Sequence, residues 1–423
     1  RTGLRSWRSG VEEARAEVHE RPWLEHYEED VPAEVSIPDI PLHQLLETSA
    51  RHWPDEPALI FGRRRMSYQF LADEARRWAA IVRDLGVRKG DRFLILLPNV
   101  PQAVIGLFGA LMAGAVVVLA NPLSSEQELA RQMSDSGAET VLTLSRFYPD
   151  VVRRLQQQGQ VRNVILTNIK TYLPWSQRTV FRFTRERQEG HRLPPYEAEK
   201  VLWWERLMRR TSGDFPPVPV TADDLAVLLS TGGTTGTPKG VMLSHRNLVA
   251  NAIQTRVWFP DLREGKETLL GVLPFSHSYG LTACLNLAVL SGSAVVLIPA
   301  FDADAVLEAI RRYHPTLFPG VPSLYAAINE FPQVRDYEIA SVKACISGAS
   351  PLPIEVQEGF EKLTKGRLVE GYGLTEASPV THANPLFGRG KIGTIGIPLP
   401  STDARILHPR SGRVLKPGVI GEL

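Results

Sequence analysis

The chain has 423 residues, of which 43% are hydrophobic and 22% are charged. This length predicts roughly two to four structural units, and the composition is that of a soluble globular protein. Lys and Arg number 48 against 46 Asp and Glu, which argues against a nucleic-acid partner. The two cysteines, Cys284 and Cys345, lack metal-ligand spacing, and no signal-peptide pattern follows Arg1. We therefore expect a cytoplasmic protein without disulfides or a zinc site.

Residues 1–40 are charged and weakly patterned, and we expect an N-terminal arm on the surface. From residue 41 onward, amphipathic helical segments alternate with short apolar strands, as in LADEARRWAAIVRDLG followed by RFLILLP. This alternation predicts an α/β fold with largely parallel sheets.

Residues 103–120 (AVIGLFGALMAGAVVVLA) carry no polar side chain and are long enough to span a membrane. However, Pro101 and Pro122 bracket the segment, and Gly114 separates a helix-like half from a β-branched run. A buried helix, a glycine stop and a buried strand of a parallel sheet explain this pattern better.

The stretch 111–122 (LMAGAVVVLANP) has a counterpart in 289–300 (VLSGSAVVLIPA). Both run from a helix end through glycine into a β-branched strand, which suggests two related α/β subdomains, at 41–222 and 223–380. After about Thr381, Gly, Pro and short β-branched runs dominate. Residues 381–423 are therefore expected to begin a small β-rich subdomain.

Residues 151–212 contain thirteen Lys and Arg against five Asp and Glu, with aromatic residues interleaved. One interpretation is a solvated insertion on the surface of the first subdomain. The alternative is that 170–210 makes peripheral contact with the anionic inner face of a membrane.

Residues 230–240 read STGGTTGTPKG, after the strand-like 225–229 and before Ser244, a predicted N-cap. Glycines allow backbone N–H groups to converge, and hydroxyls and Lys239 add donors for phosphate oxygens. The spacing fits neither a Walker A loop nor a dinucleotide fingerprint. The segment predicts a polyphosphate site, although a surface loop with a chance lysine remains the alternative.

A second stretch, GYGLTEASP (371–379), offers complementary chemistry. Tyr372 has a flat face for a nucleobase, and Thr375 has a hydroxyl for a phosphate. Glu376 supplies one carboxylate, which suffices for Mg²⁺ when phosphate oxygens and water complete the coordination. Together, the two stretches predict a nucleotide–magnesium site.

The combination resembles the adenylate-forming superfamily, which includes acyl-CoA synthetases, luciferases and peptide-synthetase adenylation domains. LPFSHSYG (273–280) and SGASPLP (347–353) are further matches in the expected order, and the resemblance runs from about Pro41 to Leu423. It implies contacts to ATP from Thr231, Gly232, Gly233, Thr234, Thr235, Gly236, Thr237, Lys239, Gly348, Ala349, Ser350, Glu370, Gly371, Tyr372, Gly373 and Thr375. It also implies catalytic roles for Thr231, Lys239, His277 and Glu376, with Glu376 and Thr231 at the metal.

Within the superfamily, Gly232 and the segments RPWLEHYEEDVP and IPLHQLLETSA resemble bacterial long-chain fatty acyl-CoA ligases. Residues 275–277 carry no carboxylate for an amino-acid substrate. Leu281 stands where some long-chain members have a gating tryptophan. An aryl or shorter-chain acid remains an alternative, as does a non-catalytic acyl- or nucleotide-binding module, and His277 could simply be a satisfied core histidine.

The resemblance implies ATP, Mg²⁺ and coenzyme A as partners of a two-step reaction. A fatty carboxylate attacks the α-phosphorus of ATP, and the thiolate of coenzyme A then attacks the acyl carbon. Positioning and charge neutralisation carry such a reaction without a protein nucleophile. The family's small C-terminal domain cannot be assigned before Leu423. We therefore expect the large domain alone, with substrate binding but little thioester formation.

Overall fold

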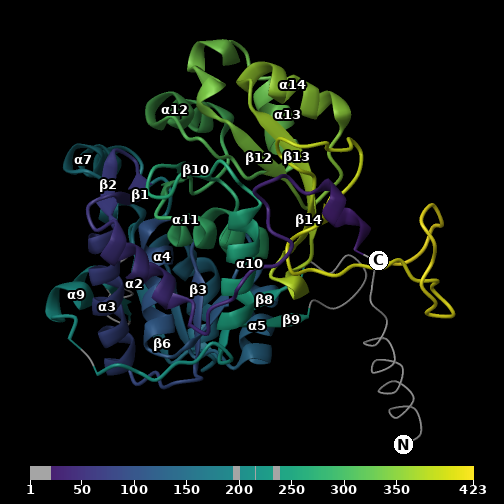
Figure 1. Cartoon of the computed structure of the whole chain (residues 1–423). Coiled ribbons are helices and arrows are strands. Elements are labelled where there is room, and N and C mark those ends of the chain that lie inside the picture. Colours follow the sequence, from purple (N-terminus) through teal and green to yellow (C-terminus); the bar gives the residue numbers. More distant parts are fainter. Residues whose placement is uncertain (1–20, 194–200, 215, 232–238) are drawn as a thin grey trace, which may run out of the picture.

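The computed structural model describes residues 21–193, 201–214, 216–231 and 239–423. Within these ranges the chain forms two layered α/β bodies that share a long boundary, with helices packed around each set of strands (Figure 1).

The first body contains a seven-stranded sheet. Its strands in spatial order are β7 (Leu202–Trp203), β6 (Asn163–Thr167), β5 (Thr140–Leu144), β3 (Arg92–Leu96), β4 (Val116–Leu119), β8 (Leu225–Ser230) and β9 (Gly240–Ser244). All neighbours pair in parallel except β8 and β9, which are antiparallel. β4 and β5 are buried along their length and β3 is buried after Arg92, as expected for a parallel sheet covered on both faces.

The second body contains two four-stranded sheets. One has the order β10 (Thr268–Gly271), β11 (Ala294–Leu297), β1 (Pro57–Phe61) and β2 (Arg64–Ser67), and the other has the order β12 (Ala344–Ser347), β13 (Arg367–Gly373), β14 (Val380–Ala383) and β15 (Ile397–Pro398). Leu317 bridges in parallel to Leu269 and to Ala344, so it connects the two sheets edge to edge. The pairs among β13, β14 and β15 are antiparallel, and β15 is the one two-residue strand that lies wholly after Thr381 among the described residues.

The sheets do not follow the division expected between residues 222 and 223. β1, near the start of the chain, pairs with β11 of the second body. β8 and β9, which follow residue 223, extend the sheet of the first body. Each body therefore contains strands from both parts of the sequence.

The helices flank these sheets. They are α2 (His43–His52), α3 (Tyr68–Asp84), α4 (Pro101–Met112), α5 (Glu126–Ser136), α6 (Arg153–Gln157), α7 (Trp175–Thr184), α9 (Trp204–Arg210), α10 (His245–Val257), α11 (Leu287–Leu290), α12 (Ala303–Tyr313), α13 (Pro322–Asn329) and α14 (Ile354–Thr364). Shorter 3₁₀ or π turns are η1 (Pro22–His26), η2 (Ser145–Phe147), η3 (Tyr148–Val152), η4 (Ile169–Tyr172), η5 (Gly280–Asn286), η6 (Val334–Tyr337), η7 (Ile339–Ser341) and η8 (Thr375–Ala377). The predicted N-cap is confirmed, because Ser244 Oγ accepts the backbone N–H of Asn247 at 3.2 Å.

The apolar segment 103–120 forms the helix, glycine turn and buried strand that its sequence pattern predicts. Every residue of α4 is buried, Gly114 has φ +77°, and β4 follows as a buried strand. The counterpart passes through Gly292, with φ +65°, from α11 into β11. Among the described residues, no helix is long and apolar enough to cross a membrane.

The basic-aromatic segment 151–212 is only partly a surface feature. β6 lies inside the seven-stranded sheet, and β7 extends that sheet at its edge. The Trp204 ring is 1% exposed and stacks on Trp78 with ring centroids 4.0 Å apart. The segment therefore completes the core of the first body, while α7 remains largely exposed.

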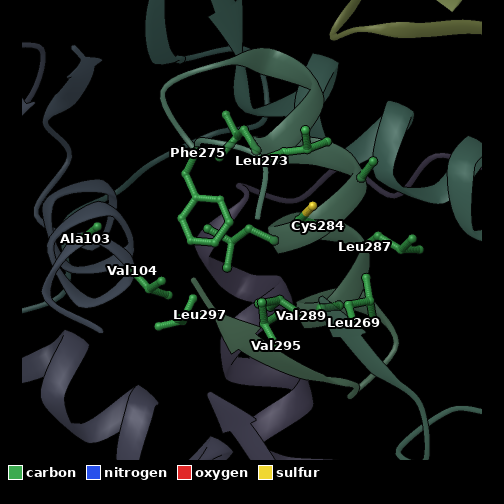
Figure 2. Packing of buried hydrophobic residues seen from close by; sticks show 14 of the residues in the cluster. Ala103, Val104, Leu269, Leu273, Phe275, Cys284, Leu287, Val289, Val295 and Leu297 are labelled. Carbon is green, nitrogen blue, oxygen red and sulfur yellow. The ribbon is translucent and has the colours of Figure 1, made fainter. Parts of the chain in front are cut away.

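The larger of two apolar core clusters in the described residues includes side chains from both bodies. Figure 2 shows the Phe275 ring among buried side chains from α4, η5 and β11, including Val104, Cys284 and Leu297. The described part of the N-terminal arm also packs inward. Tyr27 contacts Trp258 edge to face at 5.3 Å and donates its hydroxyl to the Pro398 carbonyl oxygen at 2.7 Å.

Candidate active site

A crevice of about 1920 Å³ separates the two bodies. On one side it is lined by residues that follow the carboxyl ends of β3, β4, β5, β6 and β8, among them Asn99, Leu123 and Phe147. On the other side it is lined by residues that follow β10, β11 and β12. Ligands of open α/β sheets bind outside the carboxyl ends of the strands, so this crevice is the expected site.

The two ends of the predicted phosphate loop meet at one edge of the crevice. β8 and β9 form a hairpin in which Ser230 pairs with Gly240. Beyond that pair, the Thr231 backbone N–H donates to the Lys239 carbonyl oxygen at 2.9 Å, and the Lys239 N–H donates to Thr231 Oγ1 at 3.2 Å. Both residues line the crevice. The predicted loop residues Gly232, Gly233, Thr234, Thr235, Gly236 and Thr237 lie outside the described residues.

The segment that carries His277 is held in place by Asn99 from the first body. The buried Asn99 amide donates to the carbonyl oxygens of Gly271 at 2.9 Å and Leu273 at 2.8 Å, and it accepts the Phe275 N–H at 3.1 Å. These three bonds tie the end of β3 to the loop after β10 and fix the approach to His277.

His277 lies on the lining of the crevice. Its Nδ1 accepts the backbone N–H of Tyr279 at 3.2 Å, which leaves Nε2 as the protonated nitrogen of the neutral ring. Although one side of the ring faces solvent, burial of the remainder lowers the pKa of the imidazole. The ring is thus a neutral donor at physiological pH, suited to an acceptor such as a carboxylate oxygen.

The stretch 347–353 packs directly against the same segment. The Tyr279 hydroxyl donates to the Ile346 carbonyl oxygen, and a Cβ on Gly348 would lie 3.1 Å from the Tyr279 ring. A larger residue at position 348 would therefore have to displace the Tyr279 ring by a few tenths of an ångström. Ala349 lines the crevice with φ +70°, and Ser350 is exposed beside it.

The stretch 370–373 forms the end of β13. A Cβ on Gly371 would lie 2.6 Å from the Ile346 side chain, and one on Gly373 would lie 2.1 Å from the Pro379 carbonyl oxygen. Between these two glycines, Tyr372 is 40% exposed, and its ring contacts that of His382 edge to face with centroids 6.1 Å apart. Glu370 differs from its neighbours, because its carboxylate accepts the Leu352 N–H at 3.2 Å and so supports the 347–353 loop.

Thr375 and Glu376 begin the turn η8. The Ser278 hydroxyl donates to Thr375 Oγ1 at 3.3 Å, which joins this turn to the His277 segment. Glu376 is exposed, and its carboxylate makes no hydrogen bond or ion pair with any described residue. The described ranges hold no group of three or more His, Cys, Asp or Glu side chains that could hold a metal ion.

The structure thus gathers the described parts of the four motifs. Thr231, Lys239, His277 and Ala349 line one crevice, and the segment 370–376 joins them through hydrogen bonds and strand pairing. A Mg²⁺ ion held by Glu376 together with phosphate oxygens and water would need no protein cage. The free carboxylate of Glu376 therefore fits such an ion.

Two asparagines that support the site were missed by the sequence analysis. Besides Asn99, Asn251 of α10 accepts the Val380 N–H at 2.9 Å and donates to the Val380 carbonyl oxygen at 2.7 Å. Asn251 thereby fixes β14, the strand beside β13. For Asn99 a sequence signal exists, because it is a lone asparagine in the apolar stretch LILLPNVP.

Comparison with known proteins shows that the fold of this chain is similar to that of CoA ligases. It superposes on a long-chain-fatty-acid–CoA ligase from Archaeoglobus fulgidus with a TM-score of 0.77, at 25% identity over 93% of this chain and 76% of the other. In sequence it is 39% identical to a long-chain-fatty-acid–CoA ligase of Bacillus subtilis, over 96% of this chain and 72% of the relative. It is 31% identical to 4-coumarate–CoA ligase 2 of Oryza sativa, over 92% and 68%.

The family model described as AMP-binding enzyme matches residues 46–423, and the chain belongs to this family. The resemblance to adenylate-forming enzymes that the four motifs predicted is thereby confirmed.

Proposed function

We propose that the chain activates a long-chain fatty acid with ATP to form acyl-AMP and pyrophosphate, and then transfers the acyl group to coenzyme A. Membership of the AMP-binding enzyme family supports AMP-forming ligase chemistry. The relative from Bacillus subtilis supports a long-chain acid. The observation that carries the proposal is the crevice itself, because Thr231, Lys239 and His277 line it together with apolar side chains. Charged and polar side chains, among them Arg131, Arg146 and Glu189, also contribute to its lining.

In this proposal each polar side chain acts on a group that gains or carries charge. Lys239 and the Thr231 hydroxyl bind phosphate oxygens, and Tyr372 stacks on the adenine. His277 donates from Nε2 to the acid carboxylate and orients it towards the α-phosphorus. Glu376 would hold Mg²⁺, which neutralises phosphate charge when bound. Positioning by these residues supplies the rate, since the reaction needs no covalent protein intermediate.

The apolar lining accommodates the acyl chain. Residues from several elements contribute to it, including Leu173, Phe181, Phe301 and Leu324. An aryl acid is the second candidate, because a 4-coumarate–CoA ligase is among the relatives. Pyrophosphate release measured over a panel of saturated fatty acids and cinnamic-type acids distinguishes the two. A higher kcat/KM for the aryl acids would reject the long-chain assignment.

The nucleotide site is tested by titration with ATP and Mg²⁺. Lys239→Ala removes a charge-assisted hydrogen bond and should weaken ATP binding about tenfold to a hundredfold. Lys362→Ala, which removes an exposed lysine of α14, is the matched control and should bind as the unmodified chain does. Equal weakening by both variants, or no ATP binding by the unmodified chain, would contradict the proposed site.

A further inference from the structure

Helix α7 connects the crevice with the outer surface of the first body. Its inward side chain Phe181 is 8% exposed and lines the crevice, as does Leu173 just before the helix. Gln177 anchors the same side, because its Oε1 accepts the Arg63 N–H at 3.2 Å. In Figure 1, α7 lies at the periphery of the molecule beside β1 and β2.

The opposite side of α7 presents large apolar side chains to solvent. Trp175 is 82% exposed, Phe183 is 79% exposed and Val180 is 61% exposed. Trp175 and Phe183 are eight residues apart, which places them on one helix face two turns apart. A tryptophan and a phenylalanine that share an outward face are unusual on a protein surface, where contiguous exposed apolar patches mark interaction sites.

Arginines are frequent in α7 and in the segment that follows it. Residues 175–192 contain five arginines, Arg178, Arg182, Arg185, Arg187 and Arg192, against two glutamates. Both glutamates are already engaged: Glu186 pairs with Lys170, and Glu189 pairs with Arg185 at 2.9 Å. The side chains of Arg178, Arg182 and Arg187 are exposed and make no ion pair within the described part of the chain. The face is therefore both apolar and positively charged.

We propose that this face of α7 rests on the surface of an anionic lipid bilayer. Trp175 and Phe183 enter the interface between headgroups and acyl chains, and Arg178 and Arg182 bind lipid phosphates. Charge complementarity selects this occupant, because an interfacial helix that combines aromatic residues with unpaired arginines matches anionic headgroups above an apolar layer. The lipid contact does not depend on the proposed function. Under that function, it would bring the crevice next to the phase in which long-chain acids dissolve.

The test is co-sedimentation of the chain with vesicles of phosphatidylcholine alone or mixed with phosphatidylglycerol, without ATP or acid. We expect binding to the mixed vesicles only, weakened by added salt. The double variant R178Q/R182Q should weaken it about 30-fold, since each arginine near the surface contributes about fivefold. The exposed pair Arg410 and Arg413 provides the matched control, R410Q/R413Q, which should bind normally.

Fluorescence locates the contact independently of affinity. Lipids brominated on their acyl chains should quench the emission of Trp175, and Trp175→Phe should abolish most of the quenching while the variant still pellets. Failure of the unmodified chain to pellet with anionic vesicles would overturn the proposal, as would equal effects of the two arginine pairs. Capture of a protein partner by the same face, with no lipid binding, would also overturn it. None of these outcomes bears on ATP binding, so the proposed function stands or falls separately.

Discussion

Trp204→Ala should destabilise the chain far more than Trp175→Ala, although both tryptophans belong to the same basic-aromatic segment. Trp204 is 1% exposed, stacks on Trp78, and donates its Nε1–H to the Tyr172 hydroxyl at 3.4 Å. Truncating a buried tryptophan costs about 3–5 kcal/mol, because transfer free energy and packing are both lost. Trp175 is 82% exposed, and its removal should change the free energy of unfolding by less than about 0.5 kcal/mol.

Thermal unfolding of the two variants measures the difference. At about 2.1 cal/mol/K per residue, the unfolding entropy of 423 residues is roughly 0.9 kcal/mol/K. The Tm of Trp204→Ala should therefore fall by about 3–6 °C if the chain unfolds in one transition, and that of Trp175→Ala by less than about 1 °C. Equal shifts would refute the conclusion that residues 151–212 complete the core of the first body.

Three further changes probe the site and the fold. In Gly373→Ala, the new Cβ would lie 2.1 Å from a backbone carbonyl oxygen, so β13 and β14 must separate; titration should show weaker ATP binding, and normal binding would contradict this. Asn99→Ala leaves two carbonyl oxygens and one N–H without their buried partner, so the free energy of unfolding measured by chemical denaturation should fall by about 1–3 kcal/mol. The same variant should raise the KM for the acid because His277 is displaced. An unchanged KM would argue against this positioning role of Asn99. Burial lowers the pKa of His43 to about 4 and that of His245 to about 3, so unfolding takes up protons below pH 6.5. As the pH falls, each ring should therefore lower the free energy of unfolding by roughly 1 kcal/mol per pH unit until its folded pKa is reached. A free energy of unfolding that is constant between pH 7 and pH 5 would contradict this.

The parts of the fold that were predicted from sequence are those set by local pattern. The composition of 103–120, with its prolines and Gly114, sufficed to give helix, turn and strand, because each feature acts within a few residues. The placement of β1 beside β11 was not predictable in this way. Strand partners far apart in the chain are chosen by packing of the whole core, and no local pattern records that choice.

The segment 151–212 shows how an average can mislead. Its excess of arginine favoured a surface insertion, yet the five residues of β6, NVILT, form an inner strand of the sheet. In the candidate site, too, some residues could be predicted from sequence and others could not. The four motifs were visible because several chemical groups stand close together in sequence. Asn99 was missed because it is a single amide between two apolar elements. The carbonyl groups to which it donates come from a distant part of the chain and reach it only in the folded structure.

The contact between Tyr27 and Pro398 has a consequence for how the chain folds during its synthesis. The two residues are 371 positions apart, and the neighbouring pair Arg21 and Asp403 forms an ion pair at 2.7 Å across a similar span. At synthesis rates of about 5–20 residues per second, roughly 20 to 75 s pass between the synthesis of Tyr27 and that of Pro398. During that interval the arm lacks its final partner. Pro398 and Asp403 therefore close the structure over a segment that left the ribosome well before them.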